Sequence, residues 1–392
     1  MSARVCIVGV GVVESEKPIV ELSHKEILFQ ATRKALNDAG LERKDIRGAV
    51  TASFDFLEGR SLSNQYILDS VGGVMKPCDL RLGEDAIYSL FAGYLEVRSD
   101  PSQVVVVASV QKASEREPEG FPYQELIADS MEPVFSRPVC KSVPNLASLE
   151  PVLAAMEARA FMHRSGLTED HFAAVAVKNI NNAAFAGQKD PIDLKKVLGS
   201  ETLSWPIKAM TRAEQRDAAC ALILASGKRG KKLASEPVFI RGIGWCSGRS
   251  HLPSRKQGIA QETNWAAQQA YDMAGILKPE QQIDLAEISD WYAHRELMHY
   301  EALGFCGFHD MGQKIEDGFF EKKGPFPVNV TGGLLGRGNS VGTSGLIRVA
   351  QVAQQIRGNA EGYKVPDVRV GLAHSWGGIP TASAGVAILS RW

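Results

Sequence analysis

Two stretches of this chain share one pattern, "RVCIVGVGVVES" at residues 4–15 and "PVFIRGIGWCSG" at residues 237–248. Each is an apolar, largely β-branched run that ends in alternating glycines, which is typical of a strand covered on both faces. A helical segment and a second short apolar run follow each copy, at 23–53 and at 262–292. The order strand, helix, strand therefore occurs twice.

The spacing between the two copies is nearly constant. Gly9 and Gly242 are 233 residues apart, and Gly40 and Gly275 are 235 residues apart. Gly40 and Gly275 each follow an alanine at the end of the helical segment, where a glycine ends a helix in the left-handed conformation. A repeated unit at a fixed offset indicates an internal duplication of an α/β unit.

The remaining pattern predicts an α/β protein with two halves, at residues 1–235 and 236–392. A mostly helical insertion at about 112–215 lies within the first half, and we interpret it as a cap over the site. Further strands are expected at 103–110, 219–226, 368–375 and 381–392. Helices are expected at 84–98, 149–165, 262–274 and 341–357.

Composition narrows the class of protein. Lys and Arg number 44 and Asp and Glu number 45, so the formal net charge is -1, which argues against a non-specific nucleic-acid binder. The sequence has 44% hydrophobic residues and 37 glycines, which fits a globular α/β chain. No apolar run reaches about 18 residues, and the N-terminus lacks the pattern of a signal peptide. We therefore expect no membrane span and a cytoplasmic protein.

The cysteines and histidines do not indicate a metal centre. The six cysteines are scattered and include no CxxC pair: Cys6, Cys78, Cys140, Cys220, Cys246 and Cys306. A zinc knuckle is therefore not expected, and buried free thiols are the simplest interpretation. His294 and His299 are five residues apart, which suits neither helical ligand spacing. We expect no metal.

The densest glycine segment of the chain is "GGLLGRGNSVGTSG" at residues 332–345, in which six of fourteen residues are glycine. Such a loop indicates a backbone held close to another group, for example a phosphate or a thioester. Asn339 lies at its centre. An amide cannot exchange a proton at neutral pH, so this loop does not present a general acid or base.

Four stretches together resemble the thiolase superfamily, in the branch that holds sterol-carrier-protein-type thiolases and archaeal acetyl-CoA acetyltransferases. Residues 161–187 look like its loop-domain helix pair, and 210–226 resemble its "DGAAA" strand. Residues 289–306 look like the stretch that begins "HDCF", and 329–358 are similar to the "GGxxxxGHPxGATG" loop and the helix after it. The resemblance covers essentially the whole chain. It implies the thiolase fold, two similar α/β halves stacked in five layers (αβαβα) with a helical loop domain inserted in the first half.

The resemblance also implies an activity. Members make or break a carbon–carbon bond next to a coenzyme A thioester, with no covalently bound cofactor. A cysteine at a helix N-terminus takes up the acyl group, and the histidine of "GHP" assists it. Members are dimers of thiolase-fold subunits, and related proteins often work with a small zinc-ribbon/OB-fold protein. Acyl-CoA, a second thiolase-fold subunit and such a small protein are therefore the expected partners.

The chain departs from this pattern where the nucleophile belongs. Counting back from the strand at 103–110 places that position at Gly83, within about one residue. Glu84 and Asp85 stand beside it, and charging the first turn of the helix is their ordinary role. Cys78 is the nearest thiol, and a gap in the alignment can make it the nucleophile instead.

The other family positions are replaced as well. Ser289 stands where "HDCF" has its histidine, and Trp291 and Tyr292 follow in place of Cys and Phe. Asn339 stands at the "GHP" histidine. Trp291 and Tyr292 either pack in the interior or contact the acyl-CoA. The expected coenzyme A contacts also include three glycines of the loop, Gly333, Gly338 and Gly342.

His374 is the one titratable side chain left at a family position, where the branch has "HNxG". It acts as an acid/base, or it is satisfied by neighbouring groups in a tight turn.

Three hypotheses remain open at this point. The chain is a thiolase-fold subunit without thiolase chemistry, which works beside a catalytic partner. Alternatively, it cleaves a carbon–carbon bond of an acyl-CoA by an aldol-type step with His374, Tyr292 and the glycine-rich loop. The third is an ordinary thiolase that uses Cys78.

Overall fold

The computed structural model describes residues 4–54, 67–115, 149–185, 187, 190–249, 254–379 and 382–392. The helices are α1 (His24–Asp38), α3 (Leu68–Val71), α4 (Ile87–Ser99), α7 (Leu149–Ser165), α8 (Glu169–Phe185), α9 (Leu194–Leu198), α10 (Gly227–Leu233), α11 (Gln261–Ala274), α12 (Pro279–Gln282), α13 (Ala293–Ala302), α14 (Phe308–Glu316), α15 (Gly333–Arg337) and α16 (Ser344–Arg357). The strands are β1 (Val5–Glu14), β2 (Gly48–Ala52), β3 (Cys78–Leu82), β4 (Val104–Gln111), β5 (Thr202–Ser204), β6 (Ile207–Lys208), β7 (Ala218–Ser226), β8 (Val238–Ser247), β9 (Leu285–Glu287), β10 (Val370–Trp376) and β11 (Ser383–Ser390).

The strands repeat one order in both halves. The order through the large sheet is β3-β2-β4-β7-β1 and then β8-β11-β10-β9. Strands β2, β3 and β4 are parallel to one another, as are β9 and β10, while β7 and β11 run antiparallel to their neighbours. The two halves meet where β1 pairs with β8, the two strands of the repeated sequence pattern.

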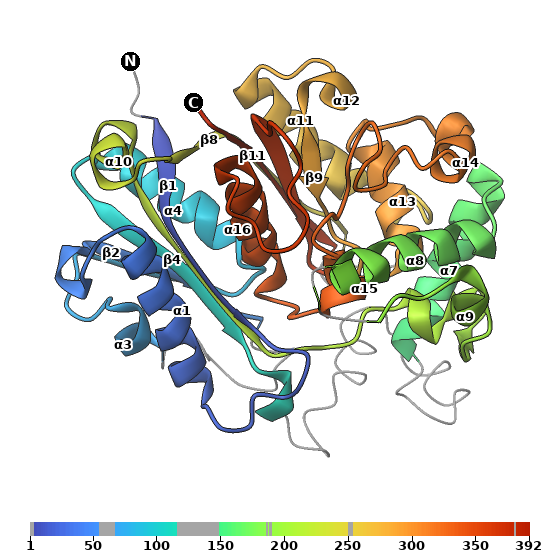
Figure 1. Cartoon of the computed structure of the whole chain (residues 1–392), viewed down its shortest axis with the longest axis horizontal. Coiled ribbons are helices and arrows are strands. Elements are labelled where there is room, and N and C mark those ends of the chain that lie inside the picture. The colour runs from blue at the N-terminus through green and yellow to red at the C-terminus, as the bar shows by residue number, and fades with distance from the viewer. Residues whose placement is uncertain are drawn as a thin grey trace.

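Helices α4 and α16 lie between the two halves of the sheet, and α1 and α11 cover the outer faces (Figure 1). One apolar cluster joins α4 and α16 to strands of both halves, and two further clusters lie under α1 and under α11. This arrangement agrees with the five layers expected. Helices α7, α8 and α9 of the insertion gather at one side of the molecule (Figure 1).

The alternating glycines allow the helix to approach the strand. A Cβ added at Gly9 would lie 2.1 Å from the carbonyl oxygen of Ala35, and one added at Gly242 would lie 2.1 Å from that of Ala270. Real Cβ atoms are not found at such distances, so α1 and α11 pack directly on the strand backbones. The same contact, repeated at nearly the same offset in the second half, is the structural counterpart of the sequence repeat.

Most expected elements are present, with shifted ends. The expected helix 84–98 begins only at Ile87, because the backbone before it is held by the Asp85 side chain. The glycine-rich segment was expected as an open loop, but it contains the short helix α15. Residues 116–148 of the insertion lie outside the described residues. No helix among the described residues is long and apolar enough to cross a membrane.

Candidate functional site

The family positions come together at the ends of the strands, between α4 and α16. The amide of Ala86 donates a hydrogen bond of 2.7 Å to the carbonyl oxygen of Gly342, which ties the start of α4 to the glycine-rich segment. The carbonyl of Asn339 accepts from the amide of Arg216 at 3.0 Å, and the carbonyl of Trp291 accepts from Ala213 at 2.9 Å. Segments far apart in sequence therefore form one site.

Gly83 lies in the exposed turn between β3 and α4. A Cβ added there would meet no atom within 4 Å, so the turn has room for a side chain. The next residue, Glu84, accepts a hydrogen bond of 2.8 Å from the Ser383 hydroxyl. Gly83, to which the sequence analysis assigned the nucleophile position within about one residue, therefore offers no side chain, and that assignment stays a prediction.

A carboxyl group lies just before the start of α4. Asp85 is buried, and its Oδ1 accepts a hydrogen bond of 2.9 Å from the amide of Ile87. A Cβ added at Gly345 would lie 2.0 Å from this oxygen and 2.8 Å from the Ser375 side chain. Burial raises the pKa of Asp85 to about 7. The carboxyl group can therefore change its protonation state near neutral pH.

The amides at the start of α15 bind an internal carboxylate. Asp290 Oδ1 accepts a hydrogen bond of 2.6 Å from Leu334, and Oδ2 accepts one of 3.1 Å from Leu335. Asn179 donates a further bond of 2.7 Å to Oδ2. A Cβ at Gly333 would lie 2.3 Å from Oδ2, so this glycine makes room for Asp290. Burial and the nearby Glu296 raise the pKa of Asp290 to about 6.

The other loop glycines of the prediction also face protein atoms. A Cβ at Gly338 would lie 1.9 Å from Cγ of Arg216, and one at Gly342 would lie 3.1 Å from the amide nitrogen of Phe54. Close internal packing accounts for both glycines. Their contact with coenzyme A remains a prediction.

Asn339 is fixed by its backbone and not by its side chain. Its amide donates a hydrogen bond of 2.7 Å to the carbonyl of Glu214. The side-chain nitrogen Nδ2 is buried and makes no hydrogen bond to any residue that the structure describes. A buried donor without a partner is costly, so a ligand carbonyl or a water placed there would be stabilised.

His374 is enclosed by its neighbours. Its Nδ1 accepts a hydrogen bond of 3.3 Å from the amide of Ser289, and its Nε2 lies 3.2 Å from the hydroxyl of Thr263. The ring centroid of His299 is 4.3 Å away. Burial, with the charge of Arg348 beyond it, holds the pKa of His374 well below its usual value. These surroundings favour the interpretation of a satisfied, neutral histidine.

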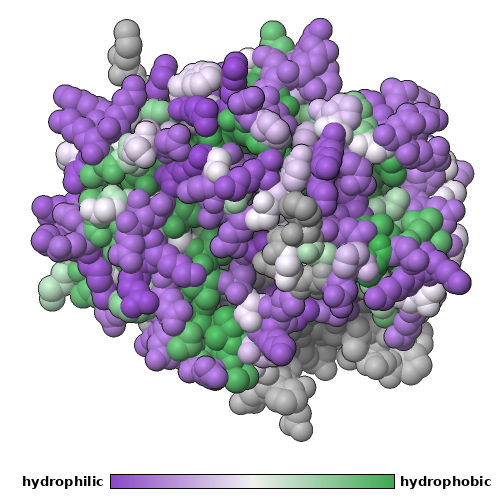
Figure 2. Space-filling model, in the orientation of Figure 1, coloured by the Kyte–Doolittle hydropathy of each residue, from purple (hydrophilic) through white to green (hydrophobic). Residues whose placement is uncertain are grey.

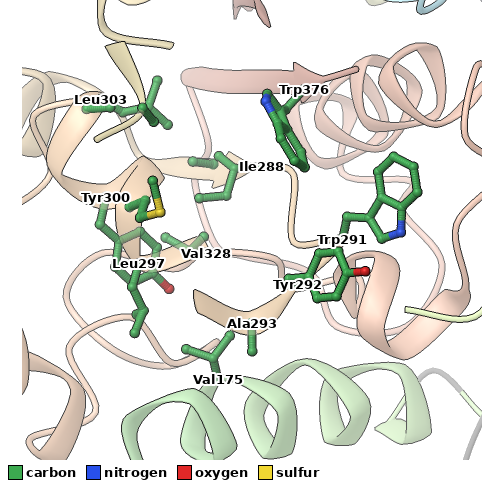
Figure 3. Packing of buried hydrophobic residues seen from close by; sticks show 14 of the residues in the cluster. Val175, Ile288, Trp291, Tyr292, Ala293, Leu297, Tyr300, Leu303, Val328 and Trp376 are labelled. Carbon is green, nitrogen blue, oxygen red and sulfur yellow. The ribbon is translucent and has the colours of Figure 1, made fainter. Parts of the chain in front are cut away.

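Trp291 and Tyr292 are buried in a cluster of aromatic and aliphatic side chains (Figure 3). The rings of Trp291 and Trp376 meet edge to face with centroids 6.1 Å apart, and Gly378 lies directly against Trp291. The backbone of Tyr292 forms an isolated β-bridge with Arg212. Of the two alternatives for these side chains, the structure favours packing in the interior.

The described thiols are poorly suited to nucleophilic attack. Cys78 begins β3, five residues before Gly83, and burial together with Glu96 raises its pKa to about 11. Burial also raises the pKa of Cys6 and of Cys306 to about 12. Cys140 lies outside the described residues. A thiolate at neutral pH is thus disfavoured at these three sites.

A buried ionic network was missed in the sequence. Glu296 on α13 forms an ion pair of 3.0 Å with Lys178 and accepts hydrogen bonds of 2.6 Å from Asn179 and 2.7 Å from Asn329. Arg348 on α16 is also buried, and its three guanidinium nitrogens make no hydrogen bond to the described part of the chain. The sequence shows charged residues within apolar helices, but it does not show which of these residues contact one another.

Comparison with known proteins gives consistent matches. Residues 246–391 match the thiolase C-terminal domain-like family. The chain is 27% identical over 383 residues, 95% of each chain, to an acetyl-CoA acetyltransferase of Methanothermobacter thermautotrophicus. It is 26% identical over 395 residues to sterol carrier protein 2 of Bos taurus, covering 95% of this chain and 70% of that protein.

A solved structure agrees in fold. The structure described as "Ltp2-ChsH2(DUF35) aldolase" superposes with a TM-score of 0.81 at 24% identity and covers 99% of this chain and 98% of that one. Together with the layer order described above, these matches confirm the predicted fold. These matches bear out the predicted resemblance to the thiolase superfamily, in the branch of the archaeal acetyl-CoA acetyltransferases and the sterol-carrier-protein-type thiolases.

Proposed function

We propose that this protein is a thiolase-like subunit of acyl-CoA metabolism that lacks the acyl-accepting cysteine and works beside a catalytic partner. The observation that carries the proposal is the start of α4, where Gly83 offers no side chain and the Asp85 carboxyl group accepts a hydrogen bond from the amide of Ile87. A carboxylate at the helix N-terminus replaces the charge that a thiolate would have there.

The replacement of the family histidine by Asn339 is consistent with the loss of the cysteine. A histidine at position 339 would serve to deprotonate a thiol, and the thiol is missing. Asn339 can still donate a hydrogen bond from Nδ2 to a thioester carbonyl. The site is therefore suited to holding an acyl-CoA without forming a covalent acyl-enzyme.

A partner subunit is part of the proposal. Strand β3 is the end strand of the sheet among the described strands and is partly exposed, so its edge is available for pairing with a second thiolase-fold subunit. The structural neighbour named above is described as an Ltp2-ChsH2(DUF35) aldolase. We propose that this chain also works with a small zinc-ribbon/OB-fold protein. The division of the chain into two halves near residue 235 remains part of the proposal.

The experiment compares the protein alone with the protein bound to its partner. We expect no cleavage of acetoacetyl-CoA by the protein alone, no acyl group retained on it after denaturation, and activity when a catalytic thiolase subunit is added. Robust cleavage by the isolated chain, with an acyl group on Cys78 or Cys140, would defeat the proposal and restore the ordinary thiolase.

A second function has one specific observation in its favour. Asp85 is a buried carboxyl group beside Ser375 with a pKa raised to about 7, which suits proton transfer in an aldol-type cleavage of an acyl-CoA. His374 was the sequence-based choice for this role, but both of its ring nitrogens already face protein groups.

Two variants separate these roles. If Asp85 is the base of such a lyase, Asp85→Asn lowers kcat at least about 100-fold, because general base catalysis contributes about that much. His374→Ala should then change kcat far less. An unchanged rate in Asp85→Asn would remove this second function.

A further inference from the structure

The buried arginine Arg348 has no role in the chemistry considered so far. Its residue is only 2% exposed, and it lies on α16 three positions after Gly345. Residues three apart lie on the same side of a helix, and Gly345 is the glycine that faces the Asp85 carboxyl group. Arg348 therefore lies on the side of α16 that meets the start of α4.

A small cavity adjoins the Arg348 side chain. It has a volume of about 10 Å³, which is room for about one water molecule, and Gly333 and Leu334 of α15 also line it. A polar groove of about 380 Å³ between α1 and α16 shares Glu14 and Arg337 with this cavity as lining residues. Hydrophilic residues predominate on the face of the molecule that carries α1 and α16 (Figure 2). The surroundings of Arg348 are therefore polar, and a water in the cavity can accept a hydrogen bond from the guanidinium.

Three buried carboxyl groups face Arg348 from other elements. They belong to Asp85 before α4, to Glu287 on β9 and to Asp290 after β9. Each accepts hydrogen bonds from neutral amide or hydroxyl groups, and none pairs with a cation among the residues that the structure describes. Arg348 is therefore the nearest cation that can compensate all three groups.

The other ionic groups near Arg348 already have partners. Glu14 on β1 forms an ion pair of 2.6 Å with Arg337. Lys178 also acts on Glu287, but it forms an ion pair of 3.0 Å with Glu296. These two pairs leave the balance between Arg348 and the three carboxyl groups unchanged.

The remaining titratable groups of this region supply no positive charge. Burial holds the pKa values of His299 and His374 well below their usual value, so both rings are neutral near pH 7. Glu84 stands next to Asp85, and burial raises its pKa as well, although its hydrogen bond from Ser383 acts in the opposite direction.

The charge of Arg348 and the ionisation of the three carboxyl groups depend on one another. Burial lowers the pKa of Arg348, whereas Asp290, Asp85 and Glu287 raise it. In return, Arg348 opposes the increase that burial causes in the pKa of each carboxyl group. A buried guanidinium without a hydrogen bond to the described chain is unfavourable while the carboxyl groups are protonated, and it becomes favourable when they ionise.

We propose that Arg348 is a positioning residue of the candidate site, whose charge compensates Asp85 and the neighbouring carboxyl groups so that Asp85 is available as a base at neutral pH. The inference deepens the second function given above, in which Asp85 takes up a proton during cleavage of an acyl-CoA, and it rests on that function. Arg348 acts through Asp85 and not on the reacting atoms.

Urea unfolding at pH 5 and at pH 8 tests the charge of Arg348 without any substrate. Arg348→Met removes the charge and leaves an unbranched side chain that can fill the space. At pH 5 the carboxyl groups of the folded protein are protonated, so the variant should have a higher urea midpoint than wild type, because it lacks an uncompensated buried charge. Arg348→Gln gives the same comparison if Arg348→Met does not fold.

The advantage of the variant should shrink or reverse at pH 8. Without Arg348 the folded carboxyl groups release their protons at higher pH than in wild type, while the unfolded chain has released them in both proteins, so the variant loses more stability between pH 5 and pH 8. Arg348→Lys keeps the charge and should follow wild type. Arg33→Met, at an exposed position on α1, is the control and should change neither midpoint. An equal loss of stability at both pH values in Arg348→Met would show that the side chain only packs, and the proposal would be wrong.

A double-mutant cycle assigns the effect to Asp85. Asp85→Asn removes one of the three carboxyl groups and leaves Glu287 and Asp290 in place. The pH-dependent change in urea midpoint that Arg348→Met causes should then fall by about one third or more in the Asp85→Asn background. The same change in both backgrounds would mean that Arg348 does not act on Asp85.

The rate of the assembled complex separates the inference from the function. Cleavage of 3-hydroxybutyryl-CoA to acetaldehyde and acetyl-CoA is the probe of an aldol-type step. We expect the acidic limb of the kcat profile to move up by about one pH unit in Arg348→Met and to return in Arg348→Lys. A limb that does not move would overturn the inference. No cleavage by wild type, together with a positive double-mutant cycle, would refute the second function and leave the action of Arg348 on Asp85 standing.

Discussion

Replacing the buried Glu287 by glutamine should stabilise the protein at alkaline pH. Glu287 on β9 is fully buried and accepts hydrogen bonds from the amide (3.1 Å) and the hydroxyl (2.9 Å) of Thr331. The hydrogen bonds lower the pKa of Glu287, but the effect of burial is larger, and the pKa rises from 4.5 to about 7. Glutamine has nearly the same shape and can keep both bonds, because the hydroxyl can also accept. The variant therefore removes a buried charge with little loss of packing.

The pKa shift sets the size and the sign of the effect. Between pH 4.5 and about 7 the unfolded chain has released this proton while the folded chain still holds it, so wild-type stability falls as pH rises. A shift of about 2.5 units corresponds to about 3 kcal/mol, most of which develops between pH 5 and pH 8. Glu287→Gln has no charge to lose or gain at this position, so its stability advantage over wild type should grow by about 2 to 3 kcal/mol over that range.

Urea unfolding at pH 5 and pH 8 measures this difference, with the free energy of unfolding taken from transitions of equal slope. Glu236→Gln is the control, because Glu236 is exposed in the segment before β8. If the glutamine variant and wild type change in parallel between the two pH values, or if the variant is the less stable at pH 8, the argument from burial is wrong.

Three further predictions concern the repeat and the family positions. Gly242→Ala should lower the free energy of unfolding by about 3 kcal/mol or prevent folding, since the added Cβ would lie 2.1 Å from a carbonyl oxygen. Gly83→Ala should change the free energy of unfolding by no more than about 0.5 kcal/mol, and thermal unfolding compares the two variants. His374→Ala should lower the unfolding free energy by about 2 kcal/mol and leave the kcat of the assembled complex within tenfold, as expected for a packed histidine. The double variant Gly83→Cys with Asn339→His should retain an acyl group from acetoacetyl-CoA, seen by peptide mass, because it returns a thiol and its base to the α4 entrance; failure to label would mean that the entrance has changed in more than these two residues.

Local patterns predicted the duplicated α/β unit, whereas the five-layer arrangement was expected from the family resemblance. The glycines of β1 and β8 and the alanine faces of α1 and α11 recur at one offset, and the structure uses them for one repeated contact. The segment 149–165 was predicted as a helix from its pattern of residues, and α7 has the same bounds. These signals lie within one element or between chain neighbours, where periodicity is informative.

The contacts of the candidate site were harder to predict from the sequence. Asp290 binding the start of α15, and Glu296 bound by Asn179 and Asn329, join residues more than thirty positions apart. Such contacts depend on tertiary packing, and a charged residue in an apolar helix does not reveal its partner. The pKa of Asp85 likewise depends on burial between α4 and α16, which no single stretch of sequence shows.

The glycine-rich segment illustrates why glycine density alone is weak support for a ligand. Gly333 gives room to the Asp290 carboxylate, and Gly338 gives room to Arg216, so both glycines are needed by the protein's own side chains. The α15 amides, which were a natural place for a phosphate, already hold the Asp290 anion. A phosphate there would have to displace a carboxylate that is covalently part of the chain and already in position.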